Sequence, residues 1–414
     1  MKKDILFLCQ FFYPEHNSSA TLPFDTAKYL ASKGYSVGAL CGYPKEYSDA
    51  GEVPLKEQVE GVDIERLHYV QLKRANTLGR LINYFSFTFK AFLHLWKLKS
   101  YKCVIVYSNP PVLPFVPVIA NALFGTKIIF VAYDVYPEVA YASNNLRKGS
   151  IIDKGMRFIN HMMYKRVSRV IALTDEMKNF LLSNRPELSE DRVTTIANWA
   201  HEKKNLPDED AYARFGYKNG QFVVSYFGNM GICQDMETLM GVAEILKDDN
   251  RVKFLLVGHG NKKDAIRERI KDNKLTNVQE LDFLTGKAFE QAVAISSCCV
   301  VSLEKGLKGT CAPSKYYSYL QGGQPVLAVV EKGSYLEEEV NREKIGCAVE
   351  VGDSKNLADR ILFMLNHKDE CKEAGERAEQ LYENMYAYDV AMNKYEDVIK
   401  KIGSLYNEIA HLKN

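Results

Sequence analysis

The 414-residue sequence has no Cys-x-x-Cys pair, and none of its nine cysteines stands near a histidine at zinc-site spacing. The cysteines are odd in number and scattered, at positions 9, 41, 103, 233, 298, 299, 311, 347 and 371. This pattern is typical of reduced thiols that are buried as small apolar side chains. A structural metal is therefore not expected.

The sequence also lacks a long apolar run and a strong charge of either sign. No run reaches the roughly 20 apolar residues that a membrane-spanning helix needs, and the segment 108–122 is interrupted by prolines. Met1-Lys2-Lys3-Asp4 leads into only a short apolar stretch, which does not predict a signal peptide. The net charge of +2 and pI near 7.9 do not indicate a general nucleic-acid binder. We expect a cytoplasmic protein without a nucleic-acid partner.

Short apolar runs alternate with helical segments over most of the chain, and 46% of its residues are hydrophobic. Such alternation predicts α/β architecture with parallel, doubly wound sheets. The pattern stops in a charged stretch and then restarts, which indicates two Rossmann-like domains facing across a cleft. The expected divisions are an N-terminal domain over 1–200, a linker over 201–219, a C-terminal domain over 220–385, and a C-terminal helix over 386–414 that packs back on the N-terminal domain.

The segment from Leu303 to Val330 is the most informative one. A strand leads into a loop with Gly306 and Gly309, then into a short helix that starts at Pro313 and Ser314 and ends at two glycines. Glycines let backbone amides approach an anion closely, and lysines at 305, 308 and 315 add full charges. This pattern predicts a diphosphate site, although an ordinary strand, loop and helix would also fit the segment alone.

Eight motifs carry a family resemblance in collinear order over nearly the whole chain. They are FFYPEHNSSAT, SNPPVLP, YDVYPE, VIALTDEMKNFL, IANWA, YFGNMG with METL, LLVGHGN, and APSKYYSYLQGGQPVLAVV. In this order they resemble the family-4 glycosyltransferases of the GT-B fold. Within that family the sequence looks closest to bacterial capsule and O-antigen enzymes of the N-acetylfucosaminyltransferase-like branch.

The resemblance implies that the C-terminal domain holds a nucleotide-sugar donor and the N-terminal domain an acceptor, with no metal or other cofactor and with retention of anomeric configuration. Gly228 and Asn229 would form the loop after the first strand of the second domain, and Phe283 and Leu284 would lie near the nucleobase. The remaining donor-binding candidates are Lys308, Gly309, Thr310, Ser314, Lys315 and Ser318.

The sequence departs from the family pattern at several of these positions. Thr310 and Ser318 stand where most members carry two glutamates, of which the second accepts hydrogen bonds from ribose hydroxyls. Ile232, Cys233 and Gln234 replace the usual basic pair, so Lys308 and Lys315 are the nearest candidates to offset the diphosphate charge. The alternative for both lysines is a solvated surface position. Tyr133 replaces a common histidine, and His259, which stands where Asp is more usual, is expected to be structural.

Polar residues follow strands of the first domain, where α/β folds place ligands. Asp134 and Glu138 are candidate catalytic residues, either orienting the acceptor hydroxyl or, in an inverting reaction, acting as base. Helix capping is the alternative for both carboxylates. His16 is a third catalytic candidate, with an exposed loop position as its alternative. Further acceptor or loop contacts are expected from Glu15, Asn17, Ser18 and Asn109.

Apolar residues recur at helical spacing between Arg74 and Lys102, and six basic residues but no acidic one occur in the same stretch. The apolar residues are Leu78, Leu81, Ile82, Phe85, Phe89, Phe92, Leu93 and Trp96. Such a helix could lie on an anionic membrane surface. A core helix with a solvated lysine face is the alternative.

The combined prediction is a cytoplasmic enzyme, peripheral on the inner face of the cell membrane, in capsule, exopolysaccharide or O-antigen synthesis. It would transfer a sugar from a nucleoside diphosphate donor, most simply a UDP-sugar, to a polyprenyl-diphosphate-linked saccharide. A sugar-nucleotide epimerase of the same fold, or a non-catalytic GT-B partner subunit, are the alternatives.

Overall fold

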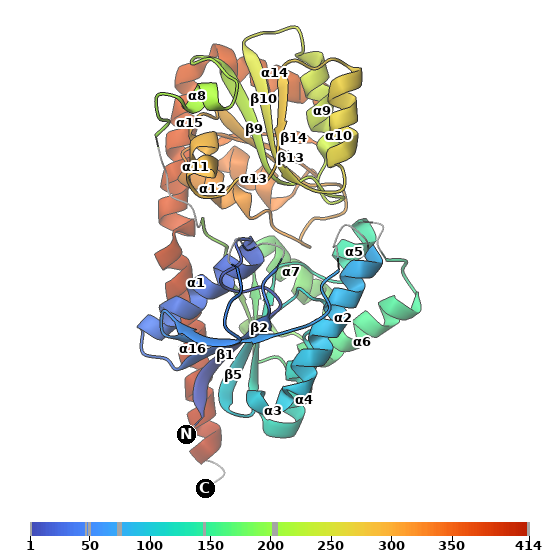
Figure 1. Ribbon diagram of the computed structural model, residues 1–414, viewed down its shortest axis with the longest axis vertical. Helices are drawn as coiled ribbons and strands as arrows, with labels where there is room; N and C mark the ends of the chain where they lie inside the picture. The colour runs from blue at the N-terminus through green and yellow to red at the C-terminus, as the bar shows by residue number, and fades with distance from the viewer. Residues whose placement is uncertain are drawn as a thin grey trace. The chain divides into compact units, whose positions relative to one another are not determined.

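The computed structural model of the chain describes residues 2–45, 48, 51–72, 77–143, 146–200 and 206–411 (Figure 1). Within this part, the side chains of Thr77 and of residues 404–411 are excluded from the description. Arg74 of the predicted basic helix and residues 201–205 of the predicted linker lie outside the described residues.

The chain forms two compact units. Unit 1 contains Met1–Asn198, Gly309–Ala312 and Asp389–Asn414, and unit 2 contains Trp199–Lys308 and Pro313–Tyr388. The C-terminal segment is therefore part of the unit formed by the N-terminal half. Residues 206–219 of the predicted linker pack onto unit 2, where the Tyr217 hydroxyl donates to the Phe254 carbonyl at 2.9 Å.

Unit 1 is built on an eight-stranded sheet of order β3-β4-β2-β1-β5-β6-β7-β8. All neighbouring strands are parallel except β3 and β4, which form an antiparallel hairpin. The central strands are buried beyond their first one or two residues, because helices cover both faces. The strands are β1 (Lys3–Cys9), β2 (Val37–Gly42), β3 (Lys56–Val59), β4 (Val62–Leu67), β5 (Tyr101–Tyr107), β6 (Lys127–Ala132), β7 (Arg169–Ala172) and β8 (Val193–Thr195).

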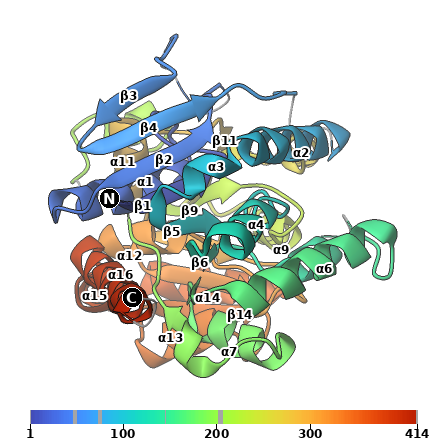
Figure 2. The same ribbon diagram turned by 90° about the horizontal axis from the view of Figure 1, so that it is seen from below.

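Helices cover the two faces of this sheet unequally (Figure 2). One face packs against α2 (Thr77–Leu93), α3 (Leu95–Leu98), α4 (Phe115–Phe124), α6 (Ile151–Arg166) and α7 (Asp175–Asn184), which bury one continuous apolar cluster with the even-numbered residues of β1. The other face carries α1 (Ser18–Ser32) and α16 (Tyr388–His411). The Tyr29 hydroxyl of α1 donates to Asn393 and Glu396 of α16, which holds the C-terminal helix in place.

Unit 2 is built on a six-stranded, wholly parallel sheet of order β11-β10-β9-β12-β13-β14. Its strands are β9 (Phe222–Asn229), β10 (Val252–His259), β11 (Val278–Leu281), β12 (Cys298–Ser302), β13 (Val326–Val330) and β14 (Gly346–Glu350). Its helices are α8 (Ala211–Arg214), α9 (Met236–Ile245), α10 (Lys263–Asp272), α11 (Gly286–Ala294), α12 (Lys315–Gln321), α13 (Tyr335–Arg342), α14 (Ser354–Asn366) and α15 (Lys368–Leu381). α15 continues into a π-helical turn at Tyr382–Tyr386.

The α/β prediction with two parallel-sheet units is confirmed. Two details of the sequence interpretation were wrong. The helical pattern between Arg74 and Lys102 does not form one helix, because it is broken at His94, which separates α2 from α3. The β3–β4 hairpin was missed because β3 is a short, exposed edge strand in which polar residues leave no apolar run.

Candidate active site

Three adjacent strands of unit 1, β1, β5 and β6, end in loops that carry the predicted catalytic and acceptor residues. Because parallel strands end at the same edge of a sheet, these loops share one edge. Each loop contains a cis X-Pro bond, at Tyr13–Pro14, Asn109–Pro110 and Tyr136–Pro137. The carboxyl edge around β1, β5 and β6 is therefore where unit 1 gathers its candidate site residues.

Asp134 lies two residues after the end of β6 at this edge and is partly buried. Its backbone N–H donates to the Ser108 hydroxyl at 3.0 Å, so the loops after β5 and β6 are held together. Burial raises the pKa of the Asp134 carboxyl to about 6. A carboxylate that is desolvated but still ionised at neutral pH is suited to accept a hydrogen bond or a proton from a sugar hydroxyl.

Glu138, the second carboxylate candidate, is held in an ion pair. The Arg185 guanidinium donates to its carboxylate at 2.7 Å and to the Tyr136 carbonyl at 3.1 Å. Both side chains are largely buried, since Arg185 is 10% and Glu138 19% exposed. Glu138 begins the short helix α5 (Glu138–Ala142), so its ion pair anchors the loop that presents Asp134.

The loop after β1 places the other predicted residues of this edge. His16 is exposed, Glu15 is buried, and Asn17 precedes Ser18, the first residue of α1. The side-chain oxygens of Asn17 and Asn109 are buried and have no hydrogen-bond partner among the described residues. A buried amide oxygen without a partner is costly, so both asparagines are suited to accept hydrogen bonds from a ligand hydroxyl.

Sequence reasoning missed two polar groups at the same edge. Both amide atoms of Gln10, which is 1% exposed, and the hydroxyl of Tyr107, 2% exposed, have no partner among the described residues. The Tyr107 ring lies 5.1 Å from that of Tyr133, the residue that replaces the family histidine. The sequence does contain a signal for Gln10, because this polar residue stands directly after the apolar strand β1.

The segment Gly309–Ala312 belongs to unit 1 although its chain neighbours belong to unit 2. The Gly309 amide donates to the Glu176 carboxylate at 2.8 Å, and the Thr310 carbonyl accepts from the Val135 amide at 2.7 Å. Cys311 forms a β-bridge with Asp134. The amide of Gly309, expected beside the donor diphosphate, is thus bonded to a carboxylate of unit 1, and Thr310 is 1% exposed beside the Asp134 loop.

In unit 2, the ends of β9 and β10 and the loops that follow them pack backbone against backbone. A Cβ at Gly258 would lie 1.8 Å from the Gly228 carbonyl oxygen, and one at Gly260 would lie 2.3 Å from the Met230 carbonyl oxygen. Only glycine fits at these two positions. At this carboxyl edge Gly228 and Asn229, predicted for the loop after the first strand, are instead the last two residues of β9, because they still pair with Gly258 and His259 of β10.

Phe283 and Leu284 follow β11 at the same edge. Phe283 is 40% exposed, and its ring centroid lies 5.6 Å from that of His259 in an edge-to-face arrangement. Burial and the nearby Lys263 lower the pKa of His259, which keeps its imidazole neutral at pH 7. A neutral ring beside an exposed aromatic ring forms an apolar wall of the kind that a nucleobase can contact.

The predicted lysines have different surroundings. The Lys315 ammonium lies 4.0 Å from the centroid of the Phe289 ring, a cation–π contact. Lys308 is exposed, and Lys305 is paired with Glu350 at 3.3 Å. Ser314 directly precedes α12, and Ser318 within α12 is 6% exposed. The Tyr319 hydroxyl ties this helix to β9, since it accepts from the Phe227 amide and donates to the Phe227 carbonyl.

Lys262, a residue that sequence reasoning missed, reaches the position where the family basic pair is lacking. Its ammonium donates to the Gln234 carbonyl at 2.7 Å and to the Glu304 carboxylate at 2.8 Å. Its backbone amide donates to the Met230 carbonyl at 2.9 Å. Lys262 therefore brings a positive charge from the loop after β10 to the loop after β9.

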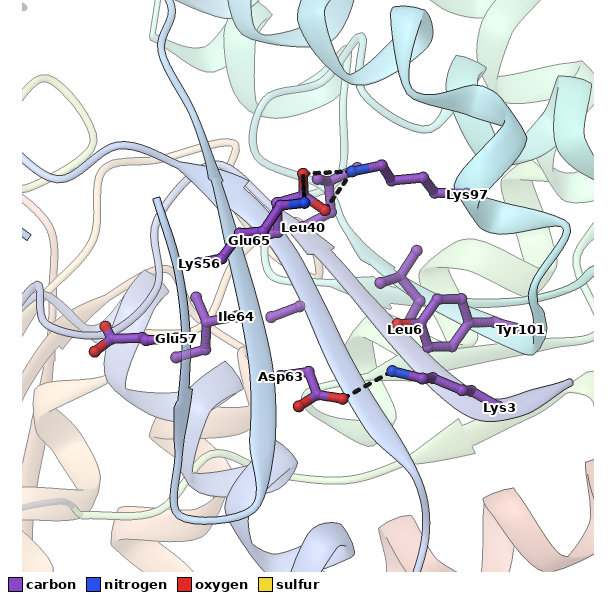
Figure 3. Close-up of a pocket in the computed structure, with 11 residues that line it drawn as sticks. Lys3, Leu6, Leu40, Lys56, Glu57, Asp63, Ile64, Glu65, Lys97 and Tyr101 are labelled. Carbon is purple, nitrogen blue, oxygen red and sulfur yellow. Dashed lines mark hydrogen bonds and ion pairs between the residues drawn. The ribbon is translucent and has the colours of Figure 1, made fainter. Parts of the chain in front are cut away.

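A separate pocket of about 380 Å³ lies at the opposite end of the unit 1 strands, near the starts of β1 and β5 (Figure 3). Its charged groups are paired: Lys3 with Asp63 at 2.8 Å and Lys97 with Glu65 within the lining, and Glu57 with Arg66 outside it. The pocket is thus remote from the carboxyl edge, and its charges are already offset. Among the described residues, no group of three or more His, Cys, Asp and Glu side chains could hold a metal ion.

Comparison with solved structures identifies the fold as GT-B. The chain is similar to a sucrose-phosphate synthase from Thermosynechococcus elongatus, with a TM-score of 0.77 and 14% identity over 98% of this chain and 100% of that one. It is also similar to Anabaena Alr3699/HepE in complex with UDP-glucose, with a TM-score of 0.69 and 17% identity over 96% and 100% of the two chains.

Sequence comparison identifies the enzyme class. Residues 221–367 match the family model described as "Glycosyl transferases group 1". The "Probable glycosyltransferase WbjE" of Pseudomonas aeruginosa is 26% identical over 66% of this chain and 69% of its own length. The "Putative colanic acid biosynthesis glycosyl transferase WcaI" of Escherichia coli (strain K12) is 21% identical over 78% and 83%. The chain is a glycosyltransferase, as expected, while closeness to N-acetylfucosaminyltransferases stays a prediction.

Proposed function

We propose that this glycosyltransferase transfers a sugar from a UDP-sugar to a polyprenyl-diphosphate-linked saccharide in the synthesis of a capsule, exopolysaccharide or O-antigen. The observation that carries the acceptor side is the desolvated Asp134 carboxylate at an edge that also holds the unpartnered amide oxygens of Asn17 and Asn109. The complex of HepE with UDP-glucose supports the donor, and the colanic acid in the name of WcaI supports the pathway.

On the donor side, the nucleobase would lie against Phe283 and Leu284, and the diphosphate near Lys262, Lys315 and Lys308. Lys262 supports this assignment because it supplies charge where the basic pair of the family is missing. Cationic side chains can stabilise the charge that develops on the leaving diphosphate, so we propose a metal-independent reaction. Activity that persists in excess EDTA would support this point, and activity that EDTA abolishes and Mg²⁺ restores would contradict it.

In the reaction, the bond between the anomeric carbon and the diphosphate oxygen breaks, and a bond forms from the anomeric carbon to the acceptor oxygen. With retention, the proton of the attacking hydroxyl passes to the leaving phosphate, and Asp134 orients the acceptor by accepting a hydrogen bond from a neighbouring hydroxyl of the saccharide. With inversion, Asp134 takes the proton itself. We propose retention, and the anomeric configuration of the product, measured by NMR, distinguishes the two routes.

The acceptor is proposed to be reached at a membrane surface through α2 and α3. Seven apolar residues of these helices are 37% to 68% exposed, which excludes them from the core: Leu78, Ile82, Phe85, Phe89, Phe92, Leu93 and Trp96. The opposite side of the helices packs into the core through Phe87, Ala91 and Leu95. No helix among the described residues is long and apolar enough to span a bilayer. The proposed contact is with the inner surface of the cell membrane.

The decisive experiment incubates the protein with a panel of nucleotide sugars, with and without membrane lipid extract, and measures nucleotide release. Release that depends on both a UDP-sugar and the extract would support the proposal. A converted nucleotide sugar formed without extract would indicate an epimerase. Failure of a folded sample to bind either UDP or GDP in isothermal titration would indicate a non-catalytic subunit.

A further inference from the structure

Helix α6 presents a second apolar stripe outside the core of unit 1. Ile151, Ile152 and Phe158 are 89%, 55% and 60% exposed. Ile151 and Phe158 are seven residues apart and so lie on the same side of the helix, whereas the buried residues Met163 and Tyr164 lie on the other. Large apolar side chains gathered on an outer helix face mark an interaction surface.

The charge around this stripe has one sign. Residues 147–166 contain six basic residues and one acidic residue, Asp153. Asp153 is buried and paired with Arg157 at 3.0 Å, so its negative charge is offset within the helix. By helical spacing, the exposed Lys154 and Lys165 flank and extend the stripe formed by Ile151 and Phe158. With six basic residues and one acidic residue, this segment has a net charge of +5, which exceeds the +2 of the whole chain.

This stripe is linked to the exposed face of α2 and α3 through α4, which contacts both α2 and α6. Trp96 of α3 packs against Phe124 at the end of α4, with ring centroids 5.1 Å apart, and Arg166 of α6 bonds Asn121 at 3.4 Å. Leu123, between these two contacts, is 61% exposed. Figures 1 and 2 both show α2 and α6 extending toward the same side of unit 1.

We propose that α6 is a second membrane-binding element, which inserts Ile151 and Phe158 into an anionic lipid bilayer together with the apolar stripe of α2. The proposal rests on the proposed function, in which α2 and α3 contact the membrane. A bilayer accounts for a broad surface that combines exposed aromatic and aliphatic residues with lysine and arginine, since apolar insertion and attraction to anionic headgroups act together.

Two contact helices would also orient unit 1. Helices α2 and α6 follow the parallel strands β4 and β6 in the sequence, so both begin on the side of the sheet where the carboxyl edge lies. The Tyr141 hydroxyl of α5 bonds Asp153, which connects the start of α6 to the segment that follows Asp134. A membrane bound by both helices would thus deliver a lipid-linked diphosphate to the edge that carries Asp134.

The test uses tryptophan fluorescence, because the chain has only two tryptophans and Trp199 is 3% exposed in unit 2. In the double variant Trp96→Phe and Phe158→Trp, the new tryptophan reports on α6 alone. We expect a blue shift and quenching by brominated lipids on vesicles that contain phosphatidylglycerol, and no change on pure phosphatidylcholine at the same salt. No change on either vesicle would overturn the proposal.

A binding experiment provides the independent control. Ile151→Ser with Phe158→Ser is expected to weaken flotation with anionic vesicles about tenfold or more, while Leu206→Ser with Ile245→Ser, exposed positions of unit 2, leaves it unchanged. If the fluorescence of Trp96 in the native chain shifts on vesicles but the double variant Ile151→Ser with Phe158→Ser binds them normally, α6 is not part of the membrane-binding surface. The proposed function then still stands. If native Trp96 does not respond, the proposed membrane contact itself fails. If the native chain forms a stable dimer and the double variant Ile151→Ser with Phe158→Ser is monomeric, the proposal is overturned in favour of self-association through α6.

Discussion

Replacing Asp134 by asparagine should make the protein more stable and less active at neutral pH. Burial raises the pKa of this carboxyl from 3.8 to about 6. The folded state therefore binds more protons than the unfolded state between these two values, so the stability of the native chain falls as pH rises through them. Asparagine has nearly the same shape and no charge, so the variant avoids this loss.

The shift corresponds to about 3 kcal/mol of unfolding free energy at pH 7.5, and to about 0.5 kcal/mol at pH 4. Urea denaturation of the native chain and of Asp134→Asn, between pH 4 and pH 8, measures the difference directly. We expect the advantage of the variant to appear as pH rises above 4 and to level off above pH 6. The same variant should lose most of its glycosyl transfer, and activity of the native chain should fall as pH falls through about 6.

Two outcomes would refute this reasoning. If Asp134 only caps a helix, asparagine would serve equally well, so stability and activity would both remain unchanged at pH 7.5. If the variant gains stability but keeps full activity, Asp134 is desolvated without a role in transfer. Asp249→Asn is a control of opposite sign, because a hydrogen bond from Arg251 lowers the pKa of Asp249. This control should lose stability at neutral pH, and the loss should vanish as pH falls below the ordinary aspartate range.

Three further predictions concern the donor site and its loop. Lys262→Met should weaken UDP binding about tenfold or more in isothermal titration. Its control, Lys305→Met, removes the exposed partner of Glu350 and should leave UDP binding unchanged. Equal effects of the two variants would exclude a diphosphate role for Lys262. Ser318→Glu should lower the melting temperature, because it buries a carboxylate at a position that is 6% exposed. UDP should restore the melting temperature if the ribose hydroxyls reach this carboxylate. A loss that UDP does not reverse would mean that the pocket differs from the family form. Gly309→Ala should destabilise the protein more than Gly306→Ala. Both glycines have positive φ, but only a Cβ at position 309 would lie 2.8 Å from the Cβ of Phe180. Equal melting temperatures of the two variants would contradict this contact.

The sequence was sufficient for the buried parallel strands and for the edge at which the candidate site residues of unit 1 lie, although not for the β3–β4 hairpin. Apolar runs such as Lys127–Ala132 predicted the buried parallel strands, and the position of Asp134 after β6 followed from where that run ends. Both inferences depend on local pattern, because a strand buried on two faces must be apolar along its whole length.

Interactions between residues distant in the sequence could not be predicted. The Gly309 amide bonds a carboxylate 133 positions away in the chain, and Lys262 reaches Glu304 across 42 positions. The raised pKa of Asp134 depends on what buries it, and the exposure of Phe85 and Phe89 on what leaves them uncovered. Periodicity places such residues on one helix face but does not tell whether that face meets the core or the outside.

The position of α16 has a consequence for how the protein is made. Unit 1 is discontinuous: its sheet is complete by Thr195, but Met392 and Tyr395, which are almost fully buried against it, are translated about 200 residues later. During synthesis, one face of the sheet must therefore wait while all of unit 2 leaves the ribosome. Such delayed, long-range closure leaves apolar surface open to aggregation and chaperone binding, so premature termination just before Asp389 would yield a chain with a finished C-terminal unit and an unfinished N-terminal one.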